Sequence, residues 1–126
     1  MFYHYIFNTY KGKSSLLEKE MRQFLDAEFK QIAKKRELKL LASSILEEHV
    51  HLLLEQAATD STEYVMKMFK GSSSRAFFLE YPSNRFVDRK LWGRGYFARK
   101  ISEKDLPKVI QYINKQHDDA GVDKRY

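Results

Sequence analysis

Segments with the residue pattern of β-strands alternate with segments of helical pattern along the whole chain. Aromatic and β-branched residues, which favour strands, fill residues 2–8, and we also interpret residues 38–46, 49–55 and 95–101 as strands. Apolar residues recur at helical spacing in three further segments, 15–37, 60–81 and from 102 onward. The order strand–helix–strand–strand–helix–strand–helix predicts an α+β fold. We expect a ferredoxin-like βαββαβ antiparallel sheet with an extra C-terminal helix.

The boundaries of these elements follow from local signals. Ser15 and Asp60 are the first residues of two capping-box patterns, which predict the starts of two helices. Ser102 is predicted to cap the third helix. Gly71 is expected to interrupt the second helix, and Pro82 to follow its end. Only two residues separate the second strand from the third, which predicts a hairpin. Residues 83–90 form a polar, basic loop in this interpretation.

Length and charge limit the class of protein. A chain of 126 residues is long enough for one core, so we expect a single domain over residues 1–126. Lys and Arg number 23 against 17 Asp and Glu, a formal charge of +6, which suits a polyanionic partner. Cysteine is absent, and the sequence contains neither a signal-peptide pattern nor an apolar span. We therefore expect a cytoplasmic protein with no membrane partner.

A histidine pair stands on the third strand. Residues i and i+2 of a strand point to the same face, so the rings of His49 and His51 can converge while Val50 faces the core. Neutral imidazoles are common metal ligands, and Gln116, Glu48 or Glu55 could supply an oxygen ligand. The alternative is a pair of half-exposed histidines bonded to water or backbone.

The last helix carries a phenol and an amide four residues apart. Helix geometry places Tyr112 about 110° and Gln116 about 70° from the centre of the apolar stripe, so both lie on its flank. A side chain in that position can face a cleft. The alternative is that Tyr112 merely covers the edge of the helix.

Four segments together resemble one family. They are His49–Leu54, Phe69–Arg75 with its Lys-Gly-Ser-Ser-Ser-Arg run, Leu91–Phe97 and Tyr112–Gln116. In this order and spacing they resemble the small single-tyrosine transposases of the HUH endonuclease superfamily, which short bacterial and archaeal insertion sequences carry and to which REP-associated tyrosine transposases are related. The chain departs from the family at Glu47-Glu48, where a proline and an acidic residue are usual, and at the end of the first strand.

The resemblance implies a reaction and its residues. His49, His51 and Gln116 would hold a divalent cation, Mg²⁺ or Mn²⁺, and Tyr112 would cleave and rejoin single-stranded DNA through a 5′-phosphotyrosine. Glu48 is a candidate for tuning this site. No nucleotide cofactor is needed, because the phosphotyrosine retains the energy of the broken phosphodiester. The implied partners are single-stranded DNA with hairpin ends and a second copy of the chain, in a homodimer with composite active sites. Such an enzyme would associate with the nucleoid when bound to DNA.

Basic and aromatic side chains are the candidates for DNA contact. They are Lys11, Lys13, Lys70, Arg75, Arg94, Trp92 and Tyr96. Each could instead be a solvated charge or a core aromatic. Two other functions stay open at this point: a nucleic-acid-binding module without catalysis, such as a domesticated relative, and a metal-dependent enzyme acting on small molecules.

Overall fold

The strands form one antiparallel sheet. In a computed structural model of the chain, the described residues are 1–12, 16, 18–82 and 90–118, with only the backbone at 117 and 118. The strands are β1 (Phe2–Asn8), β2 (Lys39–Ile45), β3 (His49–Glu55) and β4 (Phe97–Ile101), in the order β2-β3-β1-β4. Every neighbouring pair is antiparallel. This order and the helices between the strands confirm the ferredoxin-like fold.

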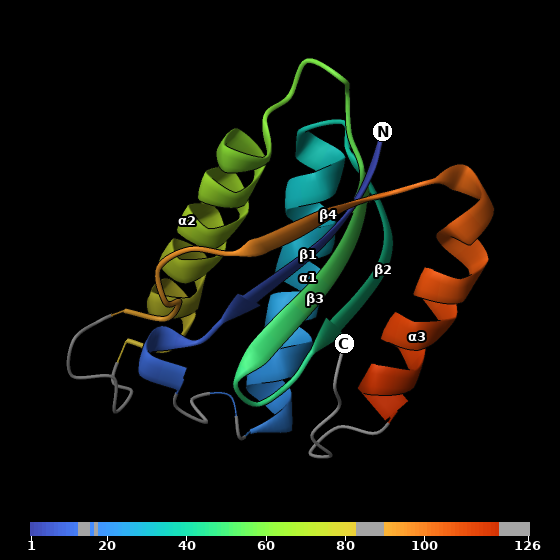
Figure 1. Cartoon of the computed structure of the whole chain (residues 1–126). Helices are drawn as coiled ribbons and strands as arrows, with labels where there is room; N and C mark the ends of the chain where they lie inside the picture. The colour runs from blue at the N-terminus through green and yellow to red at the C-terminus, as the bar shows by residue number, and fades with distance from the viewer. Residues whose placement is uncertain (13–15, 17, 83–89, 119–126) are drawn as a thin grey trace.

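Helices cover both faces of the sheet. Helices α1 (Lys19–Lys35) and α2 (Thr62–Glu80) lie on one face, and α3 (Leu106–Asp118) lies on the other (Figure 1). Two short 3₁₀ turns, η1 (Tyr10–Gly12) and η2 (Glu103–Asp105), follow β1 and β4. The expected C-terminal helix is therefore present, and its position opposite α1 and α2 gives the sheet a second buried face.

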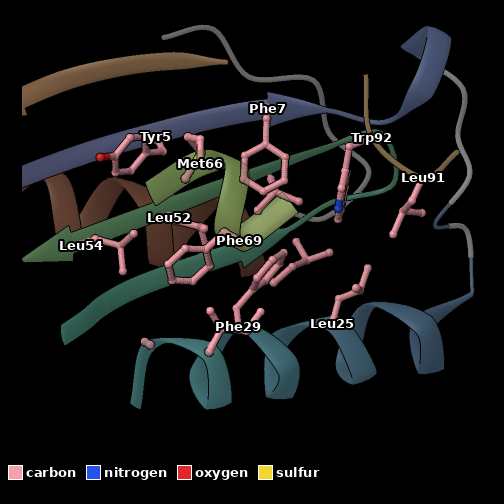
Figure 2. Packing of buried hydrophobic residues seen from close by; sticks show 14 of the residues in the cluster. Tyr5, Phe7, Leu25, Phe29, Leu52, Leu54, Met66, Phe69, Leu91 and Trp92 are labelled. Carbon is pink, nitrogen blue, oxygen red and sulfur yellow. The ribbon is translucent and has the colours of Figure 1, made fainter. Parts of the chain in front are cut away.

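The main core fills the space between the sheet and α1 and α2. Alternate residues of β1 and β3 point into it, and aromatic rings of β1 and α1 meet there (Figure 2). The rings of Phe7 and Phe29 pack edge to face with centroids 6.1 Å apart.

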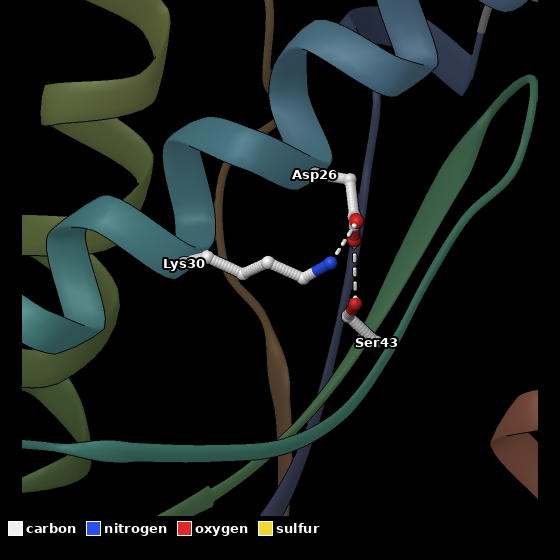
Figure 3. Close-up of polar contacts among 3 residues, drawn as sticks. All are labelled: Asp26, Lys30 and Ser43. Atoms are coloured by element: carbon white, nitrogen blue, oxygen red, sulfur yellow. Dashed lines mark hydrogen bonds and ion pairs between the residues drawn. The ribbon is translucent and has the colours of Figure 1, made fainter.

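The helix α1 is also fixed to β2 by polar contacts. Ser43 Oγ donates to Asp26 Oδ1 at 2.6 Å, and Lys30 pairs with the same carboxylate at 2.9 Å (Figure 3).

A smaller apolar cluster attaches α3 to the opposite face. Val109 and Ile113 of α3 pack with Ala42 of β2, Leu53 of β3 and Ile101 of β4, and all five are buried. These α3 residues are the apolar stripe expected from the sequence. The flank that carries Tyr112 and Gln116 is therefore held against the sheet by hydrophobic contacts beside it.

Some local predictions were wrong. Gly71 does not interrupt α2, which runs unbroken with Ser61 as its N-cap, Ser61 Oγ accepting from the Tyr64 N–H at 3.0 Å. A single helical glycine costs only about 1 kcal/mol, which packing along α2 can offset. The helix α1 begins after Glu18, so the predicted start at Ser15 falls in part on residues outside the description. Most of the predicted loop over residues 83–90 also lies outside the described residues, and β4 begins two residues later than expected.

Among the described residues, none of the helices combines the length and apolarity needed to cross a membrane.

Candidate active site

The histidine pair lies on the face of β3 that α3 covers. The sheet register sets Asn8 opposite His49 and Ile6 opposite His51, while Val50 between them is fully buried in the main core. His51 is completely buried and His49 partly so, with ring centroids 5.1 Å apart. The Nε2 atoms of both rings are shielded from solvent. The two imidazoles therefore share one side of the sheet, as the strand period predicts.

A third histidine, His4 of β1, lies beside this pair. Its Nε2 is 3.0 Å from Nδ1 of His51, and the two rings are stacked at 25° with centroids 5.2 Å apart. Burial, with a smaller effect of the Arg99 guanidinium, lowers the pKa of His4 to about 4. Burial, followed by the neighbouring His4 and His49, lowers the pKa of His51 to about 3. Both rings are neutral at pH 7, which is the form that binds metals.

Helix α3 brings the Tyr112 phenol to the histidines and buries the Gln116 amide. The ring of Tyr112 lies edge-on to His51 and to His4, with centroids 5.9 and 6.4 Å apart. One helical turn further on, Gln116 is 3% exposed, and its Oε1 is buried with no hydrogen-bond partner in the part of the chain that the structure describes. A buried amide oxygen without such a partner is costly, so Gln116 stays the candidate oxygen ligand on this helix.

A cavity opens next to Tyr112. It has a volume of about 710 Å³ and lies between α3 and the β1–β4 half of the sheet. Arg94, Arg99 and Lys108 line it, and all three are exposed. Phe97, which is 54% exposed, supplies an apolar surface to the same cavity. Positive charges around an aromatic surface suit a strand of nucleic acid.

Comparison with known proteins decides the family. Residues 1–116 match the family of IS200-like transposases. This chain belongs to that family. It is similar to the ISDra2 transposase TnpA of Deinococcus radiodurans, with 29% identity over 118 residues that cover 92% of this chain and 84% of that one. It is also similar to the IS200 transposase of Salmonella typhimurium, with 25% identity over 90% of this chain and 75% of that one.

Solved structures agree with the fold. A structure of a protein from Deinococcus radiodurans R1 named as a transposase superposes with a TM-score of 0.73 and 29% identity, covering 93% of this chain and 91% of that one. A REP-associated tyrosine transposase bound to a REP hairpin superposes with a TM-score of 0.67, covering 96% of this chain and 69% of that one. At 17% identity, the second likeness concerns the fold alone. The chain is thus a transposase of an insertion sequence, a DNA-processing enzyme.

Two residues expected to contact DNA have structural roles in this transposase. Trp92 is 8% exposed, packs against Phe7 with centroids 4.9 Å apart and donates from Nε1 to Ser73 Oγ at 2.9 Å. The ring is therefore part of the core, and the stacking role predicted for it stays a prediction. Lys70 donates from Nζ to the backbone carbonyls of Gly93 and Gly95, at 2.7 and 2.8 Å. Its ammonium fixes the segment that precedes β4.

Of the other residues predicted to contact DNA, two line the cavity and the rest do not. Arg94 and Tyr96 line it, which keeps their predicted DNA contacts open. Lys11 and Arg75 are exposed at other places, Arg75 on the helix layer opposite α3, and Lys13 lies outside the described residues. The side chain of Glu48 is exposed, and its backbone carbonyl accepts from the Thr9 N–H.

Sequence reasoning missed three features of the site: His4, Lys108 and Phe97. A signal for His4 was available, because β1 alternates between faces and places a polar side chain between Phe2 and Ile6 in a central strand. No comparable signal marks Lys108 or Phe97, since their position depends on how α3 packs.

Proposed function

We propose that this transposase cleaves and rejoins single-stranded DNA, with Tyr112 as the nucleophile and with His49, His51 and Gln116 as ligands of one divalent cation, Mg²⁺ or Mn²⁺. The observation that carries the proposal is the position of the Tyr112 ring 5.9 Å from that of His51, one helical turn from the buried Gln116 oxygen. A nucleophile and a set of metal ligands then meet on one side of the sheet.

The donor atoms suit such a cation. Two imidazole nitrogens and an amide oxygen form a mixed set that Mn²⁺ accepts well, while Mg²⁺ prefers oxygen and retains water. No three His, Asp, Glu or Cys side chains converge as a metal site in the described part of the chain, so the proposed third ligand is the amide oxygen. When bound, the cation would polarise the oxygens of the scissile phosphate and stabilise the charge that develops there.

The chemistry of Tyr112 explains why no nucleotide cofactor is required. Its phenol oxygen forms a bond to phosphorus as the bond to the 3′-oxygen breaks, and the phenol proton leaves while the 3′-oxygen gains one. The number of P–O ester bonds is unchanged. The resulting 5′-phosphotyrosine can therefore be attacked by the 3′-OH of another strand, which rejoins DNA and restores the phenol.

The cavity beside Tyr112 suits the DNA strand. Arg94, Arg99 and Lys108 can neutralise phosphates, and the exposed ring of Phe97 can stack a base. We propose that the strand that reaches Tyr112 in this cavity is single, because its bases are then free to stack on an exposed aromatic ring. The relative with the same fold is bound to a REP hairpin. We propose hairpin ends for the substrate of this chain as well.

The test is a covalent adduct. Labelled single-stranded DNA with hairpin ends is incubated with the protein and Mn²⁺ or Mg²⁺, and a denaturant-resistant protein–DNA band is expected. Tyr112→Phe should abolish the band, and His49→Ala should reduce it by at least a hundredfold. Tyr96→Phe is the matched control, since it removes another phenol at the cavity and retains the ring. An adduct that persists in Tyr112→Phe would refute the nucleophile, and binding without any adduct would favour a non-catalytic DNA-binding module.

The proposed homodimer with composite sites needs its own test. In this single chain Tyr112 lies beside His51 of the same chain, so a composite site requires α3 to exchange between two copies. We expect a mixture of Tyr112→Phe and His49→Ala proteins to recover the adduct, because one exchanged site then contains both intact groups. Failure of the mixture, with both single variants inactive and dimeric, would assign each site to one chain.

A further inference from the structure

His4 is the buried polar residue of β1 that the proposed reaction does not use. It is 4% exposed and lies in a central strand, with β3 on one side and β4 on the other. An imidazole in such a place needs a hydrogen-bond partner, because burying it unbonded costs several kcal/mol. Its partner is His51 Nδ1, 3.0 Å from His4 Nε2, and the planes of the two rings lie at 25° to each other.

A hydrogen bond between two neutral imidazoles admits two proton arrangements. In the first, His51 carries its proton on Nδ1 and donates it to the lone pair of His4 Nε2, so that the lone pair of His51 is on Nε2. In the second, His4 donates from Nε2, and the proton of His51 is on its own Nε2. A ring nitrogen that carries a proton cannot bind a metal, so only the first arrangement makes His51 a ligand.

We propose that His4 is a positioning residue, which accepts the Nδ1 proton of His51 and thereby presents His51 Nε2 to the divalent cation. The inference rests on the proposed role of His51 as a ligand and extends it to a residue on a different strand. Metal-bound histidines usually donate their second N–H to a carboxylate, a backbone carbonyl or water, and such partners typically change metal affinity 10–100-fold. Here an imidazole takes that place.

Two observations separate this role from direct ligation. His4, His49 and His51 do not converge as a three-histidine metal site in the described part of the chain. The Nε2 atom of His4 is also already directed at His51 Nδ1. Burial keeps both rings neutral at pH 7, and the lowered pKa of each fits the arrangement without adding to it.

The test compares two amides at position 4. In His4→Gln the amide oxygen reaches about as far as His Nε2 and can accept from His51, whereas the amide of His4→Asn is one methylene too short. The tautomer of His51 is read from long-range ¹H–¹⁵N correlation spectra of the metal-free, ¹⁵N-histidine-labelled protein. Mn²⁺ affinity is read by electron paramagnetic resonance of free Mn²⁺. Neither readout requires DNA or turnover.

We expect the wild type and His4→Gln to protonate His51 on Nδ1 and to bind Mn²⁺ within about threefold of each other. His4→Asn should lose the Nδ1 proton preference and bind Mn²⁺ 10–100-fold more weakly. Ile6→Val is the packing control: it trims the side chain opposite His51 without touching the hydrogen bond, and it should change neither readout.

Three results would overturn the inference. The Asn and Gln variants could behave alike, His51 could carry its proton on Nε2 in the wild type, or Ile6→Val could weaken Mn²⁺ binding as much as His4→Asn. A different result would overturn the proposed function instead. If the wild type bound no Mn²⁺ while the tautomer changed as expected across the variants, His4 would still set the tautomer of His51, and the metal role would be wrong.

Discussion

Replacing Gln116 with Leu should stabilise the metal-free protein. The amide oxygen of Gln116 is buried with no hydrogen-bond partner among the described residues, and an unsatisfied buried polar group costs about 1–3 kcal/mol. Leu has nearly the same volume and helix propensity, so the substitution removes that cost and little else. The unfolding entropy of a domain of 126 residues is about 260 cal/mol/K, which converts 1 kcal/mol into about 4 °C. We therefore expect Gln116→Leu to raise the Tm by about 4–12 °C.

A divalent cation should stabilise the wild type more than Gln116→Leu and so remove the advantage in Tm that this variant has without metal. A ligand present at 100 times its Kd stabilises the folded state by about 2.7 kcal/mol, which is about 10 °C for this chain. The wild type should gain that increment in Mn²⁺, while Gln116→Leu, which lacks the oxygen ligand, should gain much less. Scanning calorimetry of both proteins, with and without Mn²⁺, measures the two effects together.

Ser44→Ala is the matched control for Gln116→Leu. Ser44 Oγ is also buried without a hydrogen-bond partner among the described residues, and Ser44 is the β2 residue opposite His51. Its replacement should stabilise the metal-free protein as well, yet leave the Mn²⁺ increment intact. The reasoning fails if Gln116→Leu lowers the Tm of the metal-free protein, or if Mn²⁺ stabilises that variant as much as the wild type.

Three further outcomes follow from the contacts described. Trp92→Ala should cost about 3–5 kcal/mol in urea unfolding, as for a large core aromatic, and a cost below 1 kcal/mol would contradict its burial. Lys70→Met should cost about 1.5–3 kcal/mol and speed amide exchange around Gly93, because its ammonium donates to two backbone carbonyls; unchanged exchange would contradict this role. In the metal-free protein, the free energy of unfolding should fall as the pH drops from about 6.5 toward 4. The reason is that His4 and His51 take up protons in the unfolded chain, whereas burial keeps them neutral in the folded one. His4→Gln should make that fall shallower, and an equal fall in both proteins would show that other groups cause it.

The fold was accessible from the sequence because each element signals itself locally. The strand β3 was predicted with the bounds that the structure gives it, since its apolar run is limited by Glu47-Glu48 on one side and polar residues on the other. Gly71 misled the prediction of α2, because propensity is a weak local preference that packing along 19 residues overrides. The start of β4 was placed two residues too early for a related reason. The β1–β4 pairing begins at Phe97, whereas the Gly95 carbonyl accepts from Lys70 and the Tyr96 hydroxyl shares a hydrogen bond with Thr62, both on α2.

Only part of the candidate site could be predicted from the sequence. The strand period predicts that His49 and His51 share a face, and the helix period predicts that Tyr112 and Gln116 lie on one flank of the helix. The approach of α3 to β3 depends on how Val109 and Ile113 pack, which no local pattern encodes. The burial of Trp92 could not be predicted either. A tryptophan among basic residues suits base stacking by composition, and only the tertiary structure reveals its burial.

The position of α3 explains why Gln116 lowers the stability of the fold and how Tyr112 and Gln116 could serve the reaction. Its apolar stripe packs on Ala42, Leu53 and Ile101, which places its flank over the histidine face and leaves the β1–β4 side open as the cavity. A helix that only closed the core would carry an apolar residue at 116, because the amide oxygen there is buried with no hydrogen-bond partner in the described part of the chain. The chain instead carries the cost of a buried amide oxygen there, on the helix whose Tyr112 ring lies beside His4 and His51. That cost is understandable if a bound cation offsets it, so stability and activity should respond to Gln116 in opposite directions.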